Sequence, residues 1–214
     1  IGMAHLALGT ELNSKQRNYI SKVYQAAQSL LGIINDILDF SKIEAGRLEL
    51  ETVDFSLRDC VGKSVHTLAV LAAEKGLELN CRIAADVDDN LAGDPLRLRQ
   101  ILVNLINNAV KFTPAGEITV DVSLDSRTST GTLLLLSVSD TGIGIPPDRQ
   151  QAIFDAFTQA DASTTRKFGG TGLGLSIVHS IIESYDSRLE VGSRQGAGTT
   201  FSFCLKRIDP PTGA

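Results

Sequence analysis

The sequence predicts an α+β protein, with a helical N-terminal segment followed by a longer region in which helices and strands alternate. In residues 20–41, apolar side chains recur every three or four positions, which is the period of a helix that packs against another helix. After Gly46 the pattern changes to short apolar runs and helical stretches separated by glycine, proline and aspartate. The chain has 214 residues, which is enough to bury a sizeable core in one or two domains.

The N-terminal helix carries a heptad seam, in which all positions but the last are apolar. Its members are Ile20, Val23, Ala27, Leu30, Ile34, Ile37 and Ser41. A lone amphipathic helix would bury nothing, so the seam predicts a partner helix; the alternative is that it lies on the surface of the following domain. Residues 44–47 break the pattern, and we expect Gly46 to end the helix.

The region after Gly46 predicts a mixed series of strands and helices. We expect helices at residues 57–75, 95–111 and 173–185, and strands at residues 48–55, 78–83, 117–124, 132–139, 188–192 and 199–206. Gly76 should end the first of these helices, whereas Asp94 and Pro95 mark the start of the second as its N-cap and first turn. The last four strands should form two pairs, and residues 209–214 should form a proline-containing tail.

Composition argues against several classes of protein. The net charge is −5 and the isoelectric point is near 5.2, so the composition lacks the excess of basic residues that is typical of nucleic-acid-binding proteins. No apolar run is long enough to span a membrane, so we expect no membrane contact by this chain. The three cysteines match no metal-binding spacing, and we expect them to be buried small side chains in a reducing compartment.

Three segments together predict a nucleotide pocket. They are residues 104–112 (NLINNAVKF), residues 140–146 (DTGIGIP) and residues 169–175 (GGTGLGL). Neither glycine cluster is a phosphate loop, because no lysine follows it, and neither is a dinucleotide fingerprint, because the third glycine is missing. The pocket must therefore be of another kind.

Each segment supplies a different part of nucleotide chemistry. Asp140 ends an apolar run, and its carboxylate can accept a hydrogen bond from the exocyclic amine of adenine. Gly142 and Gly144 would let the backbone approach a flat base closely. The second cluster enters a helix near Leu173, where free N–H groups would form a natural phosphate site.

The asparagine-rich segment is suited to a metal ion and a phosphate. Asn104 and Asn108 are four residues apart and share one helix face, and amide oxygens suit Mg²⁺. Lys111 can reach the same face as a point charge. Each of these features alone is more often structural, but all three in this order favour an ATP pocket.

These segments resemble the conserved boxes of sensor histidine kinases. The similar stretches are residues 104–111 for the N box, 140–144 for G1, 154–157 (FDAF) for F and 170–174 for G2. The resemblance extends from about Ile1 to Lys206. It implies a Bergerat-type ATP-binding domain at residues 47–208, an α/β sandwich with one mixed sheet under three helices. It also implies that residues 1–46 are a remnant of the dimerisation and phosphoacceptor helical hairpin, with its turn at residues 9–14.

The resemblance also implies site residues, cofactors and partners. Asn108 would contact Mg²⁺, Asp140 would read adenine, and a lid over about residues 157–171 would close over the phosphates. The remaining candidate ATP-binding residues are Asn104, Lys111, Gly142, Gly144, Phe157, Arg166, Gly170, Thr171, Gly172, Leu173 and Gly174. The implied partners are ATP or ADP, a second copy through the hairpin helix, and a response regulator receiver domain. The implied location is the cytoplasmic portion of a membrane-anchored bacterial sensor protein.

Two departures from the family pattern stand out. The family's reactive histidine is followed by an acidic residue and soon a proline, but His5, His66 and His179 lack these neighbours. We therefore expect this chain to be the ATP-binding module of a protein-histidine kinase, with its phosphoacceptor histidine outside the 214 residues. The second departure is at residues 185–187, where Tyr-Asp-Ser replaces the usual pair of glycines.

Two other functions compete with the kinase interpretation. Superfamily ATPases such as gyrase carry a glutamate that activates water at the position of Asn104, and an amide cannot act as that base. A regulatory module that pairs with another sensor kinase would keep the hairpin helix and could carry a vestigial pocket. The intact glycine clusters argue against a vestigial pocket, but nothing in the sequence excludes the pairing role.

Overall fold

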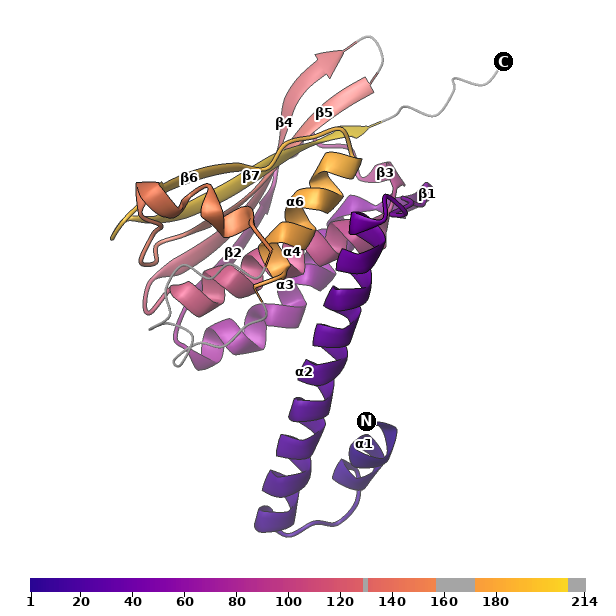
Figure 1. Cartoon of the computed structure of the whole chain (residues 1–214). Helices are drawn as coiled ribbons and strands as arrows, with labels where there is room; N and C mark the ends of the chain where they lie inside the picture. Colours follow the sequence, from indigo (N-terminus) through magenta and orange to yellow (C-terminus); the bar gives the residue numbers. More distant parts are fainter. Residues whose placement is uncertain (129–130, 157–171, 208–214) are drawn as a thin grey trace. The chain divides into compact units, whose positions relative to one another are not determined.

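The computed structural model describes residues 1–128, 131–156 and 172–207 and divides into two compact units, Ile1–Arg47 and Leu48–Ala214 (Figure 1). The first unit is a pair of helices, α1 (Gly2–Leu8) and α2 (Ser14–Glu44). Asn13 caps α2 by accepting a hydrogen bond from Gln16 N at 2.9 Å, and Gln16 Oε1 accepts one from Asn13 N at 3.1 Å. This reciprocal pair fixes where α2 begins.

The C-terminus of α2 is closed by the glycine that the sequence predicts. Gly46 has a φ of 64°, and Arg47 N donates to Lys42 O at 2.8 Å, which is the bonding pattern of a Schellman motif. No residue of the unit Ile1–Arg47 is buried. The large apolar side chains that α2 exposes are Tyr19, Val23, Leu30, Leu31, Ile33, Ile34, Ile37 and Leu38. They include four of the predicted seam positions, whereas Ile20 and Ala27 are half-buried.

The second unit is built on a mixed sheet. Its strands among the described residues are β2 (Glu78–Ile83), β4 (Glu117–Thr128), β5 (Gly131–Asp140), β6 (Glu190–Arg194) and β7 (Gly198–Arg207). They are ordered β2-β4-β5-β7-β6, with β2 parallel to β4 and the other neighbours antiparallel. A separate antiparallel pair is formed by β1 (Val53–Ser56) and β3 (Asn90–Gly93).

Three helices in the described part of this unit lie on one face of the sheet (Figure 1). They are α3 (Leu57–Glu74), α4 (Pro95–Phe112) and α6 (Gly174–Ser184), and two short 3₁₀ turns, η1 (Pro147–Arg149) and η2 (Ala152–Phe154), precede α6. The core lies between the two layers, because the strands alternate buried apolar and more exposed polar side chains. The buried apolar side chains of the five-stranded sheet are those of Ile118, Val120, Val122, Leu134, Leu136, Val138, Phe201, Phe203 and Leu205. The predicted α+β class and sandwich are therefore confirmed.

The element boundaries differ from the prediction at the start of this unit. The strand predicted at residues 48–55 begins only at Val53, because it pairs only with β3, which the sequence did not indicate. The expectation that all three cysteines are buried was also wrong. Cys81 faces the helices in register with buried Val120, but β2 is an edge strand with one neighbour, so its thiol is exposed.

The turn that departs from the family pattern is formed without glycine. Asp186 takes a φ of 53°. Among the described residues, it is the single residue other than glycine with a positive φ. Its neighbour Ser187 donates its N–H to Ile182 O at 3.2 Å and so closes α6. Aspartate tolerates this conformation better than most residues, so the turn keeps its shape at a small cost.

Candidate nucleotide-binding site

Helix α4 positions the asparagine-rich segment. Its N-cap Asp94 is buried, and Asp94 Oδ1 accepts hydrogen bonds from Leu96 N and Arg97 N, both at 3.0 Å. The apolar face of α4 packs into the core, which leaves Asn104 and Asn108 half-buried and turns Asn107 to the surface. The two candidate asparagines thus differ in environment from the third.

Asn104 lies against the second glycine cluster. A Cβ atom added to Gly174 would lie 3.1 Å from Asn104 Oδ1, so a side chain at Gly174 would crowd the amide. The structure therefore brings the asparagine-rich helix and the start of α6 together, although they are about seventy residues apart in sequence. Leu173, at the N-cap position of α6, is buried, and no side-chain hydrogen bond of a described residue caps the helix.

Asp140 and the first glycine cluster meet the other end of α4. Asp140 Oδ1 accepts a hydrogen bond from Gly142 N at 2.8 Å. A Cβ atom at Gly142 would lie 2.5 Å from Phe112 O, 2.7 Å from Asp140 Oδ1 and 2.9 Å from Thr113 Oγ1. Only glycine fits there, so the loop after β5 can approach the end of α4 this closely.

The charged groups of the site are shifted by burial. Burial raises the pKa of the Asp140 carboxyl, while hydrogen bonds from the N–H groups of Gly142 and Thr199 and the nearby Thr113 hydroxyl oppose this rise. Burial also lowers the pKa of Lys111, whose Nζ lies 4.8 Å from the ring centroid of Phe112. Asp140 and Lys111 are both half-buried.

The loop that follows Asp140 is held by the end of β6 and by the turn that follows it. Ile145 N donates to Ser193 Oγ at 2.8 Å, and Gly196 N donates to Ile143 O at 2.7 Å. Gln150 Nε2 joins the two segments by donating to Ser193 O at 3.0 Å and Ile145 O at 3.1 Å. These bonds hold the glycine loop in place without any ligand.

The predicted site residues fall into two groups. The structure brings Asn104 and Gly174 together, and it brings Asp140 and Gly142 together at the end of the same helix. Asn108 and Lys111 lie on that helix, Gly144 lies in the first glycine loop, and Gly172 and Leu173 precede α6. The candidates outside the described residues are Phe157, Arg166, Gly170 and Thr171.

The sequence did not single out Thr113, which the structure places beside Asp140. Thr113 has no exposed surface, and its Oγ1 makes no hydrogen bond to any described residue. Its position directly after the asparagine-rich segment was the sole signal in the sequence. The sequence around a single threonine does not predict whether its hydroxyl forms a hydrogen bond in the folded protein.

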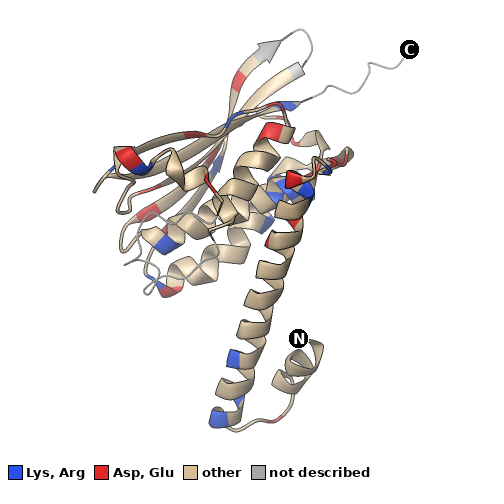
Figure 2. Cartoon of the chain, in the orientation of Figure 1, with Lys and Arg blue, Asp and Glu red and all other residues tan. Residues whose placement is uncertain are grey.

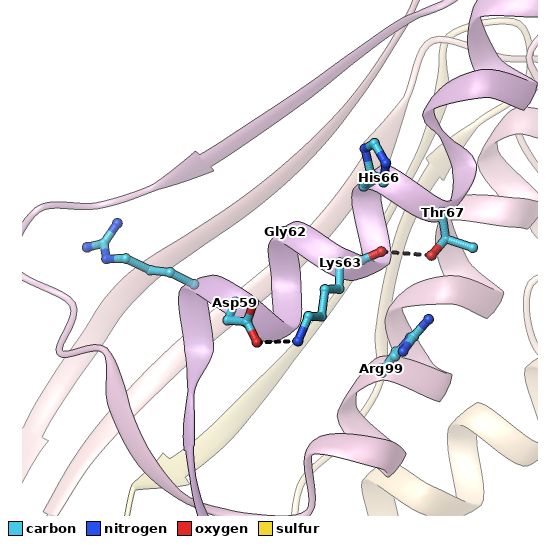
Figure 3. Close-up of a pocket in the computed structure, with 7 residues that line it drawn as sticks. Asp59, Gly62, Lys63, His66, Thr67 and Arg99 are labelled. Carbon is cyan, nitrogen blue, oxygen red and sulfur yellow. Dashed lines mark hydrogen bonds and ion pairs between the residues drawn. The ribbon is translucent and has the colours of Figure 1, made fainter.

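A separate hollow of about 460 Å³ lies on α3 and α4 (Figure 3). Its lining residues are Arg58, Asp59, Gly62, Lys63, His66, Thr67 and Arg99, none of which belongs to the predicted nucleotide site. Lys63 Nζ pairs with Asp59 Oδ2 at 2.7 Å, and the Arg58 guanidinium donates to Ala84 O at 3.2 Å. Two of its cations are thus engaged within the chain, and we assign no ligand to this hollow.

Two family models match parts of the chain. Residues 93–209 match the model described as histidine kinase-, DNA gyrase B-, and HSP90-like ATPase, and residues 1–46 match the His Kinase A (phospho-acceptor) domain. Since the first match covers more than half of the chain, the chain belongs to the histidine kinase-, DNA gyrase B- and HSP90-like ATPase family.

The relatives are sensor kinases. The chain is 45% identical over 203 residues to the signal transduction histidine-protein kinase BarA of Escherichia coli (strain K12), covering 95% of this chain and 22% of BarA. It is 45% identical over 206 residues to the sensor protein GacS of Pseudomonas syringae pv. syringae, covering 96% of this chain and 23% of GacS. The resemblance to sensor histidine kinases is therefore confirmed, and the chain spans less than a quarter of the length of these two relatives.

A solved structure has the same fold. The crystal structure of full-length ShkA in complex with AMPPNP superposes with a TM-score of 0.78 at 32% identity, covering 97% of this chain and 42% of ShkA. In the described residues, no helix is both long and apolar enough to cross a membrane.

Proposed function

We propose that this chain is the ATP-binding catalytic module of a two-component sensor histidine kinase, which transfers the γ-phosphoryl group of ATP to a histidine. The observation that carries the proposal is the meeting of three predicted segments around α4 in a chain of this family. We assign residues 47–208 to the catalytic domain, residues 1–46 to the remnant of the phosphoacceptor hairpin, and residues 209–214 to a linker.

Asp140 is the proposed reader of the base. Its Oδ1 is oriented by the Gly142 N–H, and the half-buried carboxylate can accept a hydrogen bond from the 6-amino group of adenine. The pKa of Asp140 is raised by burial, so this recognition weakens as the pH falls through that pKa and the carboxyl becomes protonated. A purine with a 6-oxo group cannot donate to it and should bind more weakly.

The proposed phosphate site lies at the start of α6 and near Lys111. The first N–H groups of an eleven-residue helix without a side-chain cap can bind an anion, and the helix dipole favours negative charge there. Lys111 would add a positive charge from α4. The candidates Phe157, Arg166, Gly170 and Thr171 belong to the same proposed site but lie outside the described residues.

The residues present also fit a Mg²⁺ ion. The described residues hold no cluster of three or more carboxylate, thiol or imidazole groups, so a metal here would use amide, phosphate and water oxygens, which Mg²⁺ accepts. We propose that Asn108 would hold it and that Asn104 lies beside it on the same helix face. A bound Mg²⁺ would neutralise charge on the phosphates.

The transfer step itself is a displacement at phosphorus. An imidazole nitrogen of the acceptor histidine attacks the γ-phosphorus, the bond to the bridging oxygen breaks, and ADP leaves with that oxygen. The contribution of this chain is positioning and charge stabilisation. None of His5, His66 and His179 has the flanking acid of the family pattern, so we propose an acceptor outside these 214 residues.

The proposed partners follow from α2 and the family. Residues 23–35 of α2 carry no charged side chain, and Figure 2 shows this uncharged stretch along the helix. Together with the exposed apolar seam, this supports a homodimer through α2. The proposed downstream partner is a response regulator receiver domain, and the proposed location is the cytoplasmic portion of a membrane-anchored sensor.

Two experiments test the function. In calorimetry with a non-hydrolysable ATP analogue, Asn108→Ala should lose the Mg²⁺ dependence of binding, whereas the matched control Asn107→Ala, at an exposed neighbour, should keep it. An Asn108→Ala variant that binds as the parent does would remove Asn108 from the metal site.

The second experiment follows the phosphoryl group. With γ-labelled ATP, the chain alone should gain no acid-labile label, and a separately supplied hairpin carrying the acceptor histidine should gain it. Binding of ATP without transfer to any hairpin would favour the regulatory alternative, and steady release of phosphate would favour an ATPase. Acid-labile label on this chain alone that is lost in His5→Gln would place the acceptor at His5.

A further inference from the structure

Thr113 is a buried hydroxyl that the fold of the apoprotein does not use. It follows α4, and its backbone N–H donates to Ala109 O at 3.0 Å. Its side chain has no exposed surface, and Thr113 Oγ1 is the buried side-chain polar atom of the described residues that has no hydrogen-bond partner. Burying an unpaired hydroxyl costs stability, and valine would fill the same volume without that cost. A threonine at this position therefore indicates a role other than folding.

The hydroxyl lies next to the proposed base reader. Thr113 Oγ1 and Asp140 Oδ1 lie 2.9 Å and 2.7 Å from the same point, the position of a Cβ atom on Gly142. The hydroxyl is close enough to favour the charged form of Asp140, although its geometry is not that of a hydrogen bond. A hydroxyl rotates freely about its C–O bond and can donate and accept at once, so a small adjustment would direct its proton to the carboxylate.

We propose that Thr113 is a positioning residue for base recognition, whose hydroxyl donates to the Asp140 carboxylate when a 6-aminopurine nucleotide is bound. The carboxylate is then held between the Gly142 N–H and the Thr113 hydroxyl, with its remaining acceptor capacity directed at the 6-amino group. Closure of this bond supplies the partner that Thr113 lacks in the free protein. The inference rests on the proposed function of Asp140 and extends it to the residue that orients it.

The test compares two nucleotides and four proteins. The non-hydrolysable analogue of ATP and inosine triphosphate, which lacks the 6-amino group, are titrated into the parent, Thr113→Val, Thr113→Ser and the control Thr67→Val. Thr67 lies exposed on α3, where its hydroxyl donates to Lys63 O at 2.8 Å. Thermal unfolding of each free protein is measured in parallel.

The expected result is a loss of base discrimination without a loss of stability. Thr113→Val should bind the ATP analogue about tenfold more weakly, the effect of one lost charge-assisted hydrogen bond, and bind inosine triphosphate nearly as the parent does. Its Tm should equal or exceed that of the parent, because an unpaired buried hydroxyl is replaced by a methyl group. Thr113→Ser should restore the discrimination, and Thr67→Val should leave it unchanged.

Other outcomes overturn the proposal. If Thr113→Val keeps the parent's preference for ATP, Thr113 does not position Asp140, and the proposed function stands. If Thr113→Ser fails to restore the preference while its Tm falls, the residue is structural. If the parent itself shows no preference for the ATP analogue, both the role of Asp140 and that of Thr113 fail. Should Thr113→Val not fold, Thr113→Ala removes the same hydroxyl and must lose the discrimination.

Discussion

Replacing Gly142 by alanine tests how tightly the loop after β5 is fitted to α4. The backbone of Gly142 does not have a positive φ, so the effect of a side chain is steric. The new Cβ would meet Phe112 O at 2.5 Å, Asp140 Oδ1 at 2.7 Å and Thr113 Oγ1 at 2.9 Å. All three distances are shorter than real contacts of a Cβ atom, and the shortest is to Phe112 O, a backbone atom that cannot move aside as a flexible side chain can.

The magnitude follows from these distances. Restoring an ordinary contact with Phe112 O, which begins near 3.4 Å, moves the loop by about 0.9 Å. Such overpacking costs about 1–3 kcal/mol, and the hydrogen bond from Gly142 N to Asp140 is weakened at the same time, which adds about 1 kcal/mol. The total of about 2–4 kcal/mol corresponds to a fall in Tm of roughly 5–15 °C for a chain of this size.

The assay is thermal unfolding, combined with titration of an ATP analogue, and Gly62→Ala serves as the matched control. Gly62 lies within α3 with nothing within 4 Å of its added Cβ, so alanine there should raise stability by about 0.5–1 kcal/mol. Gly142→Ala should also bind the ATP analogue at least tenfold more weakly, because Asp140 is displaced. A Gly142→Ala protein with the parent's Tm and affinity would refute the steric argument and the place of this loop in the site.

Four further changes have defined outcomes. Asp140→Asn should weaken binding of an ATP analogue by about 1–3 kcal/mol in calorimetry, while exposed Asp148→Asn should not; an equal effect would count against Asp140 as the base reader. Ile34→Asp places a charge in the exposed seam and should raise the fraction of monomer in sedimentation. A parent protein that is already monomeric would contradict the role of the seam in dimerisation. Burial raises the pKa of Cys60 from 9.0 to about 11, so the free energy of unfolding should fall as pH rises through this range, by about 1.4 kcal/mol per pH unit. In urea unfolding, the free energy of Cys60→Ala should depend less steeply on pH than that of the parent. Equal slopes for the two proteins would show that the Cys60 thiol is not the source of the pH dependence. Asp186→Val should cost about 1–2 kcal/mol relative to Asp186→Gly in thermal unfolding, because a β-branched residue fits a φ of 53° poorly, and equal stabilities would show that the turn adapts.

Most elements of the fold could be predicted because their signals are local. Asp94 and Pro95 mark the start of α4, and Gly46 and Gly76 mark the ends of α2 and α3, through backbone preferences that depend on a few neighbouring residues. The strand β3 could not be predicted, because its four residues show no alternation and are held by pairing with β1. The exposure of Cys81 also depends on which strand forms the edge of the sheet, and periodicity alone does not say that.

The candidate site was predictable in outline for a different reason. Asp140, Gly142 and Asn104 stand in motifs whose order and spacing are specific, and the structure places them around one helix. Thr113 was not predictable, because the absence of a hydrogen-bond partner is a property of the packed environment and not of the sequence. The same holds for the bonds of Ser193 that hold the glycine loop, since they join segments about fifty residues apart.

The helical unit Ile1–Arg47 contains no buried residue, and this has a consequence for its folding equilibrium. A single helix of thirty-one residues gains little from propensity alone, and here no apolar side chain is fully removed from water to add to it. Anything that covers the apolar face of α2 binds the folded helix and not the unfolded chain, and so shifts the equilibrium by mass action. The helicity of residues 14–44 should therefore rise with protein concentration, whereas the unfolding of the sheet-containing unit should not depend on it.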